Sequence, residues 1–469
     1  MVFHSPNFWI FFALLFIGYA LFRKARIAIL AIGNVIFYAA SGWGMLAVFL
    51  FVTIATFLCV HGMKKSRWLF WVGILLNIAN LVFFKYTLFL LDTLKEITGL
   101  SVGIYDSLAS SIILPVGISF YTFQLLSYLI DVRRGDIVPT TSLVRFWVYI
   151  SLFPQLVAGP IMRGDELIPQ LDEIQQKKLR WSEIKYGLFL FVVGLLKKIA
   201  LADPIAEIVN PLFAKGDAIS SVESWIAAYG FGFQIYYDFS AYSDMAMGLG
   251  CILGIRLILN FDTPYLSASP TEFWKRWHIS LSRWIRDYIY IGLGGNRKGP
   301  IRVQFNLLAA MLISGLWHGA MWTFVVWGGV HGLLQIVHKW SLKLNRLGWV
   351  EQLRKSKVYR VFAVLVFFHV ITWTWVFFRA QSIGQAWDMT VKMIQMPMLE
   401  LLKHPELVWM AALFLLHIVE YFIRHYEHKA SKLWHYVPFP VRSAAYVLIV
   451  LVIFYLQKGE AYDFIYFQF

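Results

Sequence analysis

Long apolar stretches recur along the chain from Phe8 to Tyr455, with only short polar intervals between them. A transmembrane helix needs about 20 mostly apolar residues, and fewer where the bilayer is locally thin. Twelve segments qualify, near 6–22, 27–41, 45–62, 68–91, 110–130, 145–162, 184–202, 222–258, 305–337, 359–379, 406–423 and 440–456. The pattern predicts an all-α fold: a multi-pass transmembrane helical bundle of about 11–13 spans, some of them re-entrant or broken. Since no long polar block interrupts it, we expect one integral membrane domain over residues 1–469.

Composition supports a membrane protein over a soluble one. Hydrophobic residues make up 59% of the chain and charged residues only 15%, which is more apolar than an ordinary soluble domain. The net charge is +15, but the Lys and Arg residues form short clusters between apolar runs instead of one basic face. This arrangement fits membrane topology and contact with lipid, and it argues against nucleic-acid binding.

The basic clusters alternate along the chain. They follow the first, third and fifth apolar segments, as Arg23, Lys24 and Arg26, then Lys64, Lys65 and Arg67, then Arg133 and Arg134. Because cytoplasmic loops are enriched in Lys and Arg, the alternation predicts an extracytoplasmic amino terminus. The first apolar run precedes its charges, whereas a signal peptide has charges first, so we interpret it as a retained span.

Three intervals do not fit simple spans. Segment 145–162 carries two prolines and a glycine, and the next loop, 175–181, is again basic, which predicts a re-entrant hairpin. Intervals 222–258 and 305–337 are too long for one span, and the second contains five glycines and no charged residue. We therefore expect paired or broken helices in both.

The only two cysteines, Cys59 and Cys251, lie in apolar stretches. This excludes a disulfide framework or a CxxC metal site, so we expect no metal and assign both residues to packing. Sequence signatures of soluble nucleotide-binding, serine-hydrolase and zinc-protease enzymes are also missing.

The stretch from Glu272 to Gly299 reads as a helix that opens at Ser269, Pro270 and Thr271. At helical spacing, one face would hold Trp274, Trp277, His278, Leu281, Trp284, Ile285 and Tyr288, and the other Lys275, Arg276, Ser282, Arg283, Arg286 and Asp287. A helix lying in an anionic membrane interface needs such opposed faces. That interpretation does not explain His278, which is either a buried hydrogen-bonding residue or a functional group facing a cavity.

A second histidine, His318, lies in SGLWHGAMW at 314–322, within the charge-free interval. Burying an imidazole beside Trp317 costs free energy unless it is hydrogen-bonded or lines a wet cavity. A buried imidazole without a carboxylate partner stays neutral, and a neutral imidazole is the usual general base for a hydroxyl or thiol. A packed polar residue remains the alternative. His331, thirteen positions later, would face away from His318 on a straight helix, so we favour a structural role unless the chain breaks at Gly328 and Gly329.

Two acidic residues, Asp238 and Asp244, lie inside the apolar segment YYDFSAYSDMAMG. Intramembrane acids can mark ion pathways, which keeps a secondary transporter or flippase open as an alternative. The internal repeat symmetry expected of many transporters is not visible.

Five stretches together resemble the membrane-bound O-acyltransferase family, specifically its bacterial branch for alginate, peptidoglycan and cellulose O-acetylation. They are PVGISFYTFQLLSYLIDVRRG (115–135), FPQLVAGPIMR (153–163), YYDFSAYSDMAMGLG (236–250), FDTPYLSASPTEFWKRWHISLSRWIRDYIYIGLGGNR (261–297) and SGLWHGAMWTFVVWGGVHG (314–332). The resemblance implies a helical fold around a central funnel, with a core motif region at 111–337. It also implies that His318 is catalytic, that His278 is its companion, and that the Asp238 segment is scaffold.

The resemblance further implies an acetyl group taken from a cytoplasmic thioester donor, acetyl-CoA, with no bound cofactor. It implies a separate extracytoplasmic acetyltransferase of the SGNH type as partner, a polysaccharide as the indirect acceptor, and the bacterial cytoplasmic (inner) membrane as location. Expected supporting residues are Trp317, Trp277, Arg276, Asp287, Asn296 and His331. Residues expected to contact donor phosphates are Lys275, Arg283, Arg286 and Arg297, although membrane anchoring explains these charges equally well.

A close alternative keeps the chemistry and changes the acyl group. The teichoic-acid D-alanyl transfer proteins share the family fold and an RWH-type motif, and they take their acyl group from a small carrier protein. The runs IYIGLGGNR and SGLWHGA in this chain favour the acetylation branch.

Overall fold

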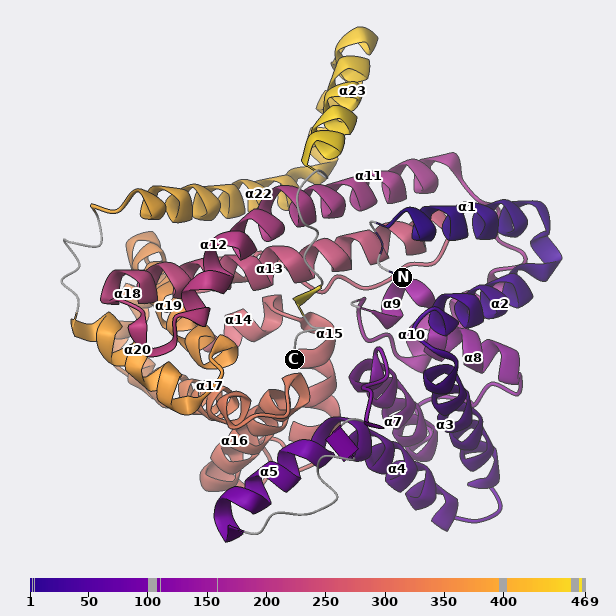
Figure 1. Cartoon of the computed structure of the whole chain (residues 1–469), viewed down its shortest axis with the longest axis horizontal. Helices are drawn as coiled ribbons and strands as arrows, with labels where there is room; N and C mark the ends of the chain where they lie inside the picture. Colours follow the sequence, from indigo (N-terminus) through magenta and orange to yellow (C-terminus); the bar gives the residue numbers. More distant parts are fainter. Residues whose placement is uncertain are drawn as a thin grey trace. The chain divides into compact units, whose positions relative to one another are not determined.

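The computed structural model describes residues 1, 3, 5–99, 108, 109, 111–157, 159–395, 403–456, 464 and 465. Helices joined by short loops make up these ranges, and none of their residues lies in a β-strand (Figure 1). The predicted all-α fold class is confirmed.

The chain forms two compact units. The first contains Met1–Gly194 and Tyr242–Leu259, and the second contains Leu195–Ala241 and Asn260–Phe469. Two long helices, α11 and α13, contribute residues to both units. That the whole chain is one membrane domain stays a prediction.

The first unit consists of α1 (Pro6–Leu21), η1 (Arg23–Ala25), α2 (Arg26–Ala39), α3 (Trp43–Gly62), α4 (Trp68–Leu81), η2 (Val82–Tyr86), α5 (Thr87–Thr98), α7 (Ile118–Arg134), α8 (Leu143–Ser151), α9 (Phe153–Leu156), α10 (Gly164–Glu173), most of α11 (Trp181–Lys197) and the end of α13 (Ser221–Ile252). The second unit consists of η3 (Lys198–Ala202), α12 (Asp203–Ala214), η4 (Gly216–Ala218), most of α13, η5 (Pro264–Leu266), α14 (Pro270–Arg276), α15 (Ile279–Trp284), η6 (Ile285–Tyr290), α16 (Gly299–His318), α17 (Trp322–Ser341), η7 (Leu342–Arg346), α18 (Gly348–Lys355), α19 (Lys357–Arg379), α20 (Ile383–Gln395), α22 (Pro405–Tyr436) and α23 (Phe439–Leu456).

Several helices are long and apolar enough to cross a membrane. Within the described residues, five meet the requirement individually, namely Trp43–Gly62, Trp68–Thr98, Gly299–His318, Lys357–Arg379 and Val408–Tyr426. Helices α1 and α2 meet it together, although they are bent by 117° at their junction. These helices support a multi-pass membrane protein. The total of about 11–13 spans also counts shorter and broken helices, and it stays a prediction.

The intervals expected to be paired or broken behave differently from one another. Interval 305–337 is indeed a pair, α16 and α17, and the chain breaks at residues 319–321 instead of at Gly328 and Gly329. For interval 222–258 the expectation was wrong, because α13 runs unbroken through 32 residues, about 48 Å. No proline interrupts it, and three of its four glycines, Gly230, Gly232 and Gly248, lie where other helices pack closely.

Segment 145–162 is interrupted, as its prolines predict. Helix α8 ends at Ser151, and the short helix α9 begins two residues later. The side chain of Asn34 on α2 bridges the break, since it donates to the Ser151 hydroxyl (3.1 Å) and accepts from the backbone N–H of Phe153 (3.1 Å). A buried backbone N–H left free by a helix break needs such a partner. Whether this segment is re-entrant in the membrane stays a prediction.

Glycines hold α16 and α17 in close contact along their length. A Cβ at Gly315 would lie 2.2 Å from the Phe324 carbonyl oxygen, and a Cβ at Gly328 would lie 2.4 Å from the Met311 carbonyl oxygen. Only residues without a side chain allow the two backbones to approach this closely. The pair therefore places the end of α16 rigidly against the start of α17.

The intramembrane acid Asp238 has a buried cationic partner. Lys198 Nζ lies 2.9 Å from Asp238 and 2.8 Å from Asp203, and the backbone N–H of Ile465 also donates to Asp238 (2.7 Å). The Lys198 side chain is only 1% exposed. This packed ion network gives Asp238 a structural role and fits the scaffold role implied by the family resemblance.

We expect Asp238→Asn to lower the free energy of unfolding by about 3 kcal/mol, because it breaks a buried ion pair without replacing it. Thermal unfolding of the purified full chain in detergent measures the effect. Asp388→Asn is the matched control, since its half-exposed pair with Lys392 spans one helical turn and contributes about 0.5 kcal/mol. Equal stability of the two variants would contradict a structural role for Asp238.

Candidate functional site

The segment around His278 is not the continuous helix that we expected. Helix α14 ends at Arg276, Trp277 and His278 leave the helical conformation, and α15 starts at Ile279. The predicted start is correct, because the Ser269 side chain accepts from the backbone N–H of Glu272 (3.2 Å). The predicted sidedness also survives the break. The aromatic-face residues are buried except for half-buried Trp274, and Lys275 and Arg286 on the other face are exposed.

A hydrogen-bonded clamp stabilises this break. Asn260 accepts from the backbone N–H of Ile279 (2.9 Å) through its carbonyl, and its side-chain oxygen accepts from the backbone N–H (3.1 Å) and hydroxyl (2.9 Å) of Ser280. His278 adopts a left-handed conformation with φ 41°. Non-glycine residues rarely adopt it, and they do so where surrounding contacts enforce it, often at functional sites. The clamp thus orients the His278 side chain.

His318 reaches the same region from another element. It is the last residue of α16, and Gly319 continues the chain in extended conformation. A Cβ at Gly319 would lie 2.0 Å from the ring of Phe324, so this turn requires glycine. The helix end and the tight turn after it together fix the position of the imidazole.

The two predicted histidines come together in the interior of the second unit. Their ring centroids are 6.5 Å apart, with ring planes inclined by 63°. His278 is fully buried, and His318 is 2% exposed. Trp317 contacts both rings, at 5.6 Å from His278 and 5.1 Å from His318. The structure therefore confirms that these two residues and Trp317 are neighbours; their catalytic roles stay predictions.

Aromatic side chains enclose the pair. Trp327 and Phe378 pack against His318 with centroid distances of 5.2 and 5.1 Å, and Phe239 packs against His278 at 4.7 Å. Such walls exclude water, which strengthens any electrostatic or proton-transfer interaction inside them. Trp277 belongs to the next layer, where it packs on Trp375 (4.8 Å).

His331 lies in the same aromatic cluster and also packs against Trp327. Its ring is 4.6 Å from Trp327, and its Nε2 is 3.2 Å from the Thr374 hydroxyl oxygen. The Thr374 hydroxyl donates to the Ile371 carbonyl oxygen (2.7 Å), so Nε2 of His331 must be the donor in the first bond. This arrangement supports the structural role that we favoured.

We expect His331→Gln to retain most of the acyl transfer activity that the family resemblance implies and to change the free energy of unfolding by less than about 1 kcal/mol, because the glutamine amide can still donate to the Thr374 hydroxyl. Thr374→Val removes this hydrogen bond and should lower the free energy of unfolding by about 1 kcal/mol. Transfer assays and thermal unfolding on matched protein amounts measure both. A large loss of transfer in a stable His331→Gln protein would assign this histidine to the chemistry.

A polar network on α22 lies next to the aromatic residues around Trp277. Glu420 on α22 accepts from the Tyr236 hydroxyl (2.7 Å) and is paired with Lys197 and Arg424. One turn earlier on α22, His417 accepts from the backbone N–H of Tyr265 (3.3 Å) through Nε2. The rings of Tyr236 and Tyr265 both lie beside Trp277. The segment that carries His278 is thereby connected to α22.

Arg276 has structural partners. Its guanidinium lies 3.1 Å from Glu272 and 3.2 Å from the Asp262 carbonyl oxygen. Burial alone would raise the pKa of Glu272, but the backbone N–H of Ala268 and the guanidinium groups of Arg360 and Arg276 lower it below its ordinary value. We interpret Arg276 as a residue that holds α14 in place, and not as one that contacts a substrate.

Two of the residues expected near the donor, Arg286 and Asn296, have side-chain partners within the protein. Arg286 is bound by Asp287, with Nε 2.6 Å from Oδ1. Asn296 accepts from the Tyr290 hydroxyl (2.7 Å) and from Lys339 Nζ (2.8 Å). Lys275 and Arg297 are exposed and Arg283 is half-buried. Their role in donor binding stays a prediction.

Sequence reasoning missed the walls of the site. These wall residues come from three helices, and only their helical spacing hinted at burial: Phe239 from α13, Trp327 from α17, and Trp375 and Phe378 from α19. Trp375 and Phe378 are three residues apart on α19 and so share one face, which is a detectable signal. The sequence does not indicate which other helix packs against this face of α19.

Comparison with known proteins gives the site a context. The family model described as MBOAT, membrane-bound O-acyltransferase family, matches residues 136–381, which include both histidines. The chain is 38% identical to the probable alginate O-acetylase AlgI of Azotobacter vinelandii, over 84% of this chain and 78% of that protein.

Two further relatives are named for a different acceptor or a different acyl group. The peptidoglycan O-acetyltransferase of Helicobacter pylori is 34% identical over 81% of this chain and 72% of its own length. The teichoic acid D-alanyltransferase of Bacillus subtilis is 26% identical over 55% of this chain and 66% of its own length.

Proposed function

Because the chain belongs to the membrane-bound O-acyltransferase family and is an acyltransferase, we propose that it transfers acetyl groups from a cytoplasmic thioester donor for O-acetylation of an extracytoplasmic polysaccharide. The names of the relatives at 38% and 34% identity support acetyl as the acyl group. The relatives named for D-alanyl transfer are less similar and match less of the chain. Acyltransferase chemistry also replaces the transporter alternative.

One observation carries the proposal for the site. Two histidines from separate elements, His278 and His318, meet 6.5 Å apart inside an aromatic enclosure. Burying two imidazoles costs free energy that apolar side chains at these positions would not cost. Ionisable groups kept in such a place usually have a function. A neutral imidazole in a water-poor enclosure can accept a proton from a hydroxyl.

In the proposed reaction, His318 takes the proton of an acceptor hydroxyl as its oxygen attacks the thioester carbonyl carbon. The C–O bond forms, the C–S bond breaks, and the thiolate leaves and takes up the proton held by His318. His278 orients the thioester and stabilises the negative charge that develops on its carbonyl oxygen. Trp317, which contacts both rings, keeps them in this relation.

Donor identity is tested with membranes that contain the intact chain. Radiolabelled acetyl-CoA and a D-alanyl-loaded carrier protein are supplied separately, and label in hydroxyl esters is measured against membranes without the chain. We expect transfer from acetyl-CoA. Transfer only from the carrier would replace this proposal with the D-alanyl alternative.

We infer an inner-membrane location with an extracytoplasmic amino terminus, from the alternation of basic loops. A separate extracytoplasmic acetyltransferase of the SGNH type would place the acetyl group on the polymer. Co-purification of such a protein with the full chain tests this partnership, and acetylation of polymer by the chain alone would argue against it.

A further inference from the structure

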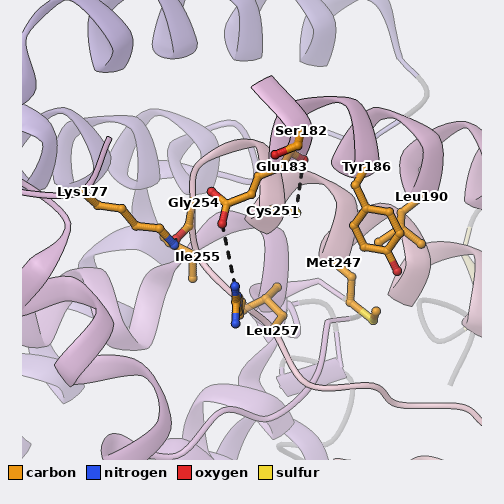
Figure 2. A pocket seen from close by; sticks show the side chains of 11 residues that line it. Lys177, Ser182, Glu183, Tyr186, Leu190, Met247, Cys251, Gly254, Ile255 and Leu257 are labelled. Atoms are coloured by element: carbon orange, nitrogen blue, oxygen red, sulfur yellow. Dashed lines mark hydrogen bonds and ion pairs between the residues drawn. The ribbon is translucent and has the colours of Figure 1, made fainter. Parts of the chain in front are cut away.

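The first unit contains a cavity separate from the histidine pair. It measures about 390 Å³ and lies among the start of α11, the end of α13 and the loop that follows α13. Figure 2 shows charged side chains toward one side, with Tyr186, Leu190 and Met247 toward the other. A lining that is charged at one end and apolar at the other matches an amphiphilic ligand.

The charged end carries both signs. Lys177 Nζ donates to the Gly254 carbonyl oxygen (2.5 Å), and Arg256 is 3.8 Å from the Glu183 carboxylate, with its side chain 81% exposed. Among the residues that the structure describes, no group donates a hydrogen bond to the Glu183 carboxylate. Two cations that retain free N–H groups can bind a phosphate, and a carboxylate without hydrogen-bond donors can bind an ammonium group.

The charged end lies with the predicted cytoplasmic loops. Arg26, from the basic loop after the first predicted span, donates to the carbonyl oxygens of Ile174 (2.9 Å) and Lys177 (2.6 Å). Arg23 from the same loop donates to the Gln175 carbonyl oxygen (2.8 Å). Two basic segments thus meet at one level, where the headgroups of the cytoplasmic leaflet are expected.

The helices that form the cavity are fixed at one point. A Cβ at Gly187 on α11 would lie 2.5 Å from the Gly248 carbonyl oxygen on α13, and the reverse distance is also 2.5 Å. Glu183, Tyr186 and Leu190 of α11 line the cavity on either side of this crossing. The cavity is therefore part of the packed fold of this unit.

We propose that this cavity binds an aminophospholipid, a lipid that carries a phosphate and a primary ammonium group. Lys177 and Arg256 bind the phosphate, Glu183 accepts hydrogen bonds from the ammonium group, and the acyl chains follow Tyr186, Leu190 and Met247. The site would bind lipid independently of acyl transfer, so its test does not depend on the function proposed above.

Cysteine content allows a direct test. Cys251 lines the cavity, and the only other cysteine, Cys59, is buried, so Cys59→Ser leaves one reporter thiol at the site. The delipidated full-length protein is mixed with phosphatidylethanolamine, phosphatidylcholine or phosphatidylglycerol, and the rate of alkylation by N-ethylmaleimide is followed by intact mass. We expect phosphatidylethanolamine to slow alkylation by about fivefold at a concentration about four times its Kd. The other two lipids should protect less.

Variants identify the headgroup contacts. Glu183→Gln should abolish the preference for phosphatidylethanolamine over phosphatidylglycerol, while Lys177→Gln or Arg256→Gln should weaken protection by all three lipids. Glu207→Gln, an exposed acid outside the cavity, is the charge-matched control and should change nothing. Equal protection by the three lipids, protection that is best with phosphatidylglycerol, or no protection at all would each overturn the proposal.

Discussion

Replacing His318 by alanine should lower acetyl transfer by about 10²–10⁴-fold, the usual contribution of a general base. The expectation rests on the position of His318 at the end of α16, 2% exposed and 6.5 Å from His278 by ring centroids. Transfer from radiolabelled acetyl-CoA is measured in membranes with matched amounts of folded protein.

Folding must be separated from chemistry in this experiment. Alanine leaves a cavity among Trp317, Trp327 and Phe378, so some loss of stability is expected as well. His318→Gln fills more of that space and cannot act as a base, so it should be nearly as inactive and more stable. His331→Gln, in the same aromatic cluster, is the histidine control. Normal transfer by His318→Ala would return this residue to a packing role.

Replacing Gly328 by alanine should also lower acyl transfer strongly, through the fold. The new Cβ would lie 2.4 Å from the Met311 carbonyl oxygen and 3.2 Å from Leu312 Cα. These are backbone atoms, so α16 and α17 must separate, at a cost of about 1–3 kcal/mol. Because His318 ends α16, we also expect a strong reduction in acyl transfer.

The neighbouring glycine provides the control. A Cβ at Gly329 would meet only Leu312 Cδ2, at an ordinary 3.7 Å. Alanine favours helix over glycine by about 1 kcal/mol, so Gly329→Ala should be neutral or stabilising. Thermal unfolding in detergent and transfer assays compare the two variants. Equal behaviour would show that the close contact of α16 and α17 does not position His318.

The lengths and polarity of the apolar runs were enough to predict many helices. Helices α3 and α19 fall close to the predicted segments 45–62 and 359–379, since a continuous apolar run of about 20 residues has few other stable conformations in a bilayer. The prediction for 222–258 was wrong because length alone does not reveal a break. Helix α13 has no proline, and its glycines are used for close packing instead.

The sequence by itself also determined which residues near His278 are buried, because helical spacing separates an aromatic face from a basic one. Only the tertiary structure decided that the helix breaks at Trp277 and His278, since the stabilising contacts come from Asn260, far outside any helical turn. Likewise, the sequence placed Asp238 inside an apolar segment, and only packing showed that Lys198 is its partner. Local periodicity determines which face of a helix is apolar. Long-range contacts decide which other element packs against that face, and they also bring His278 close to His318.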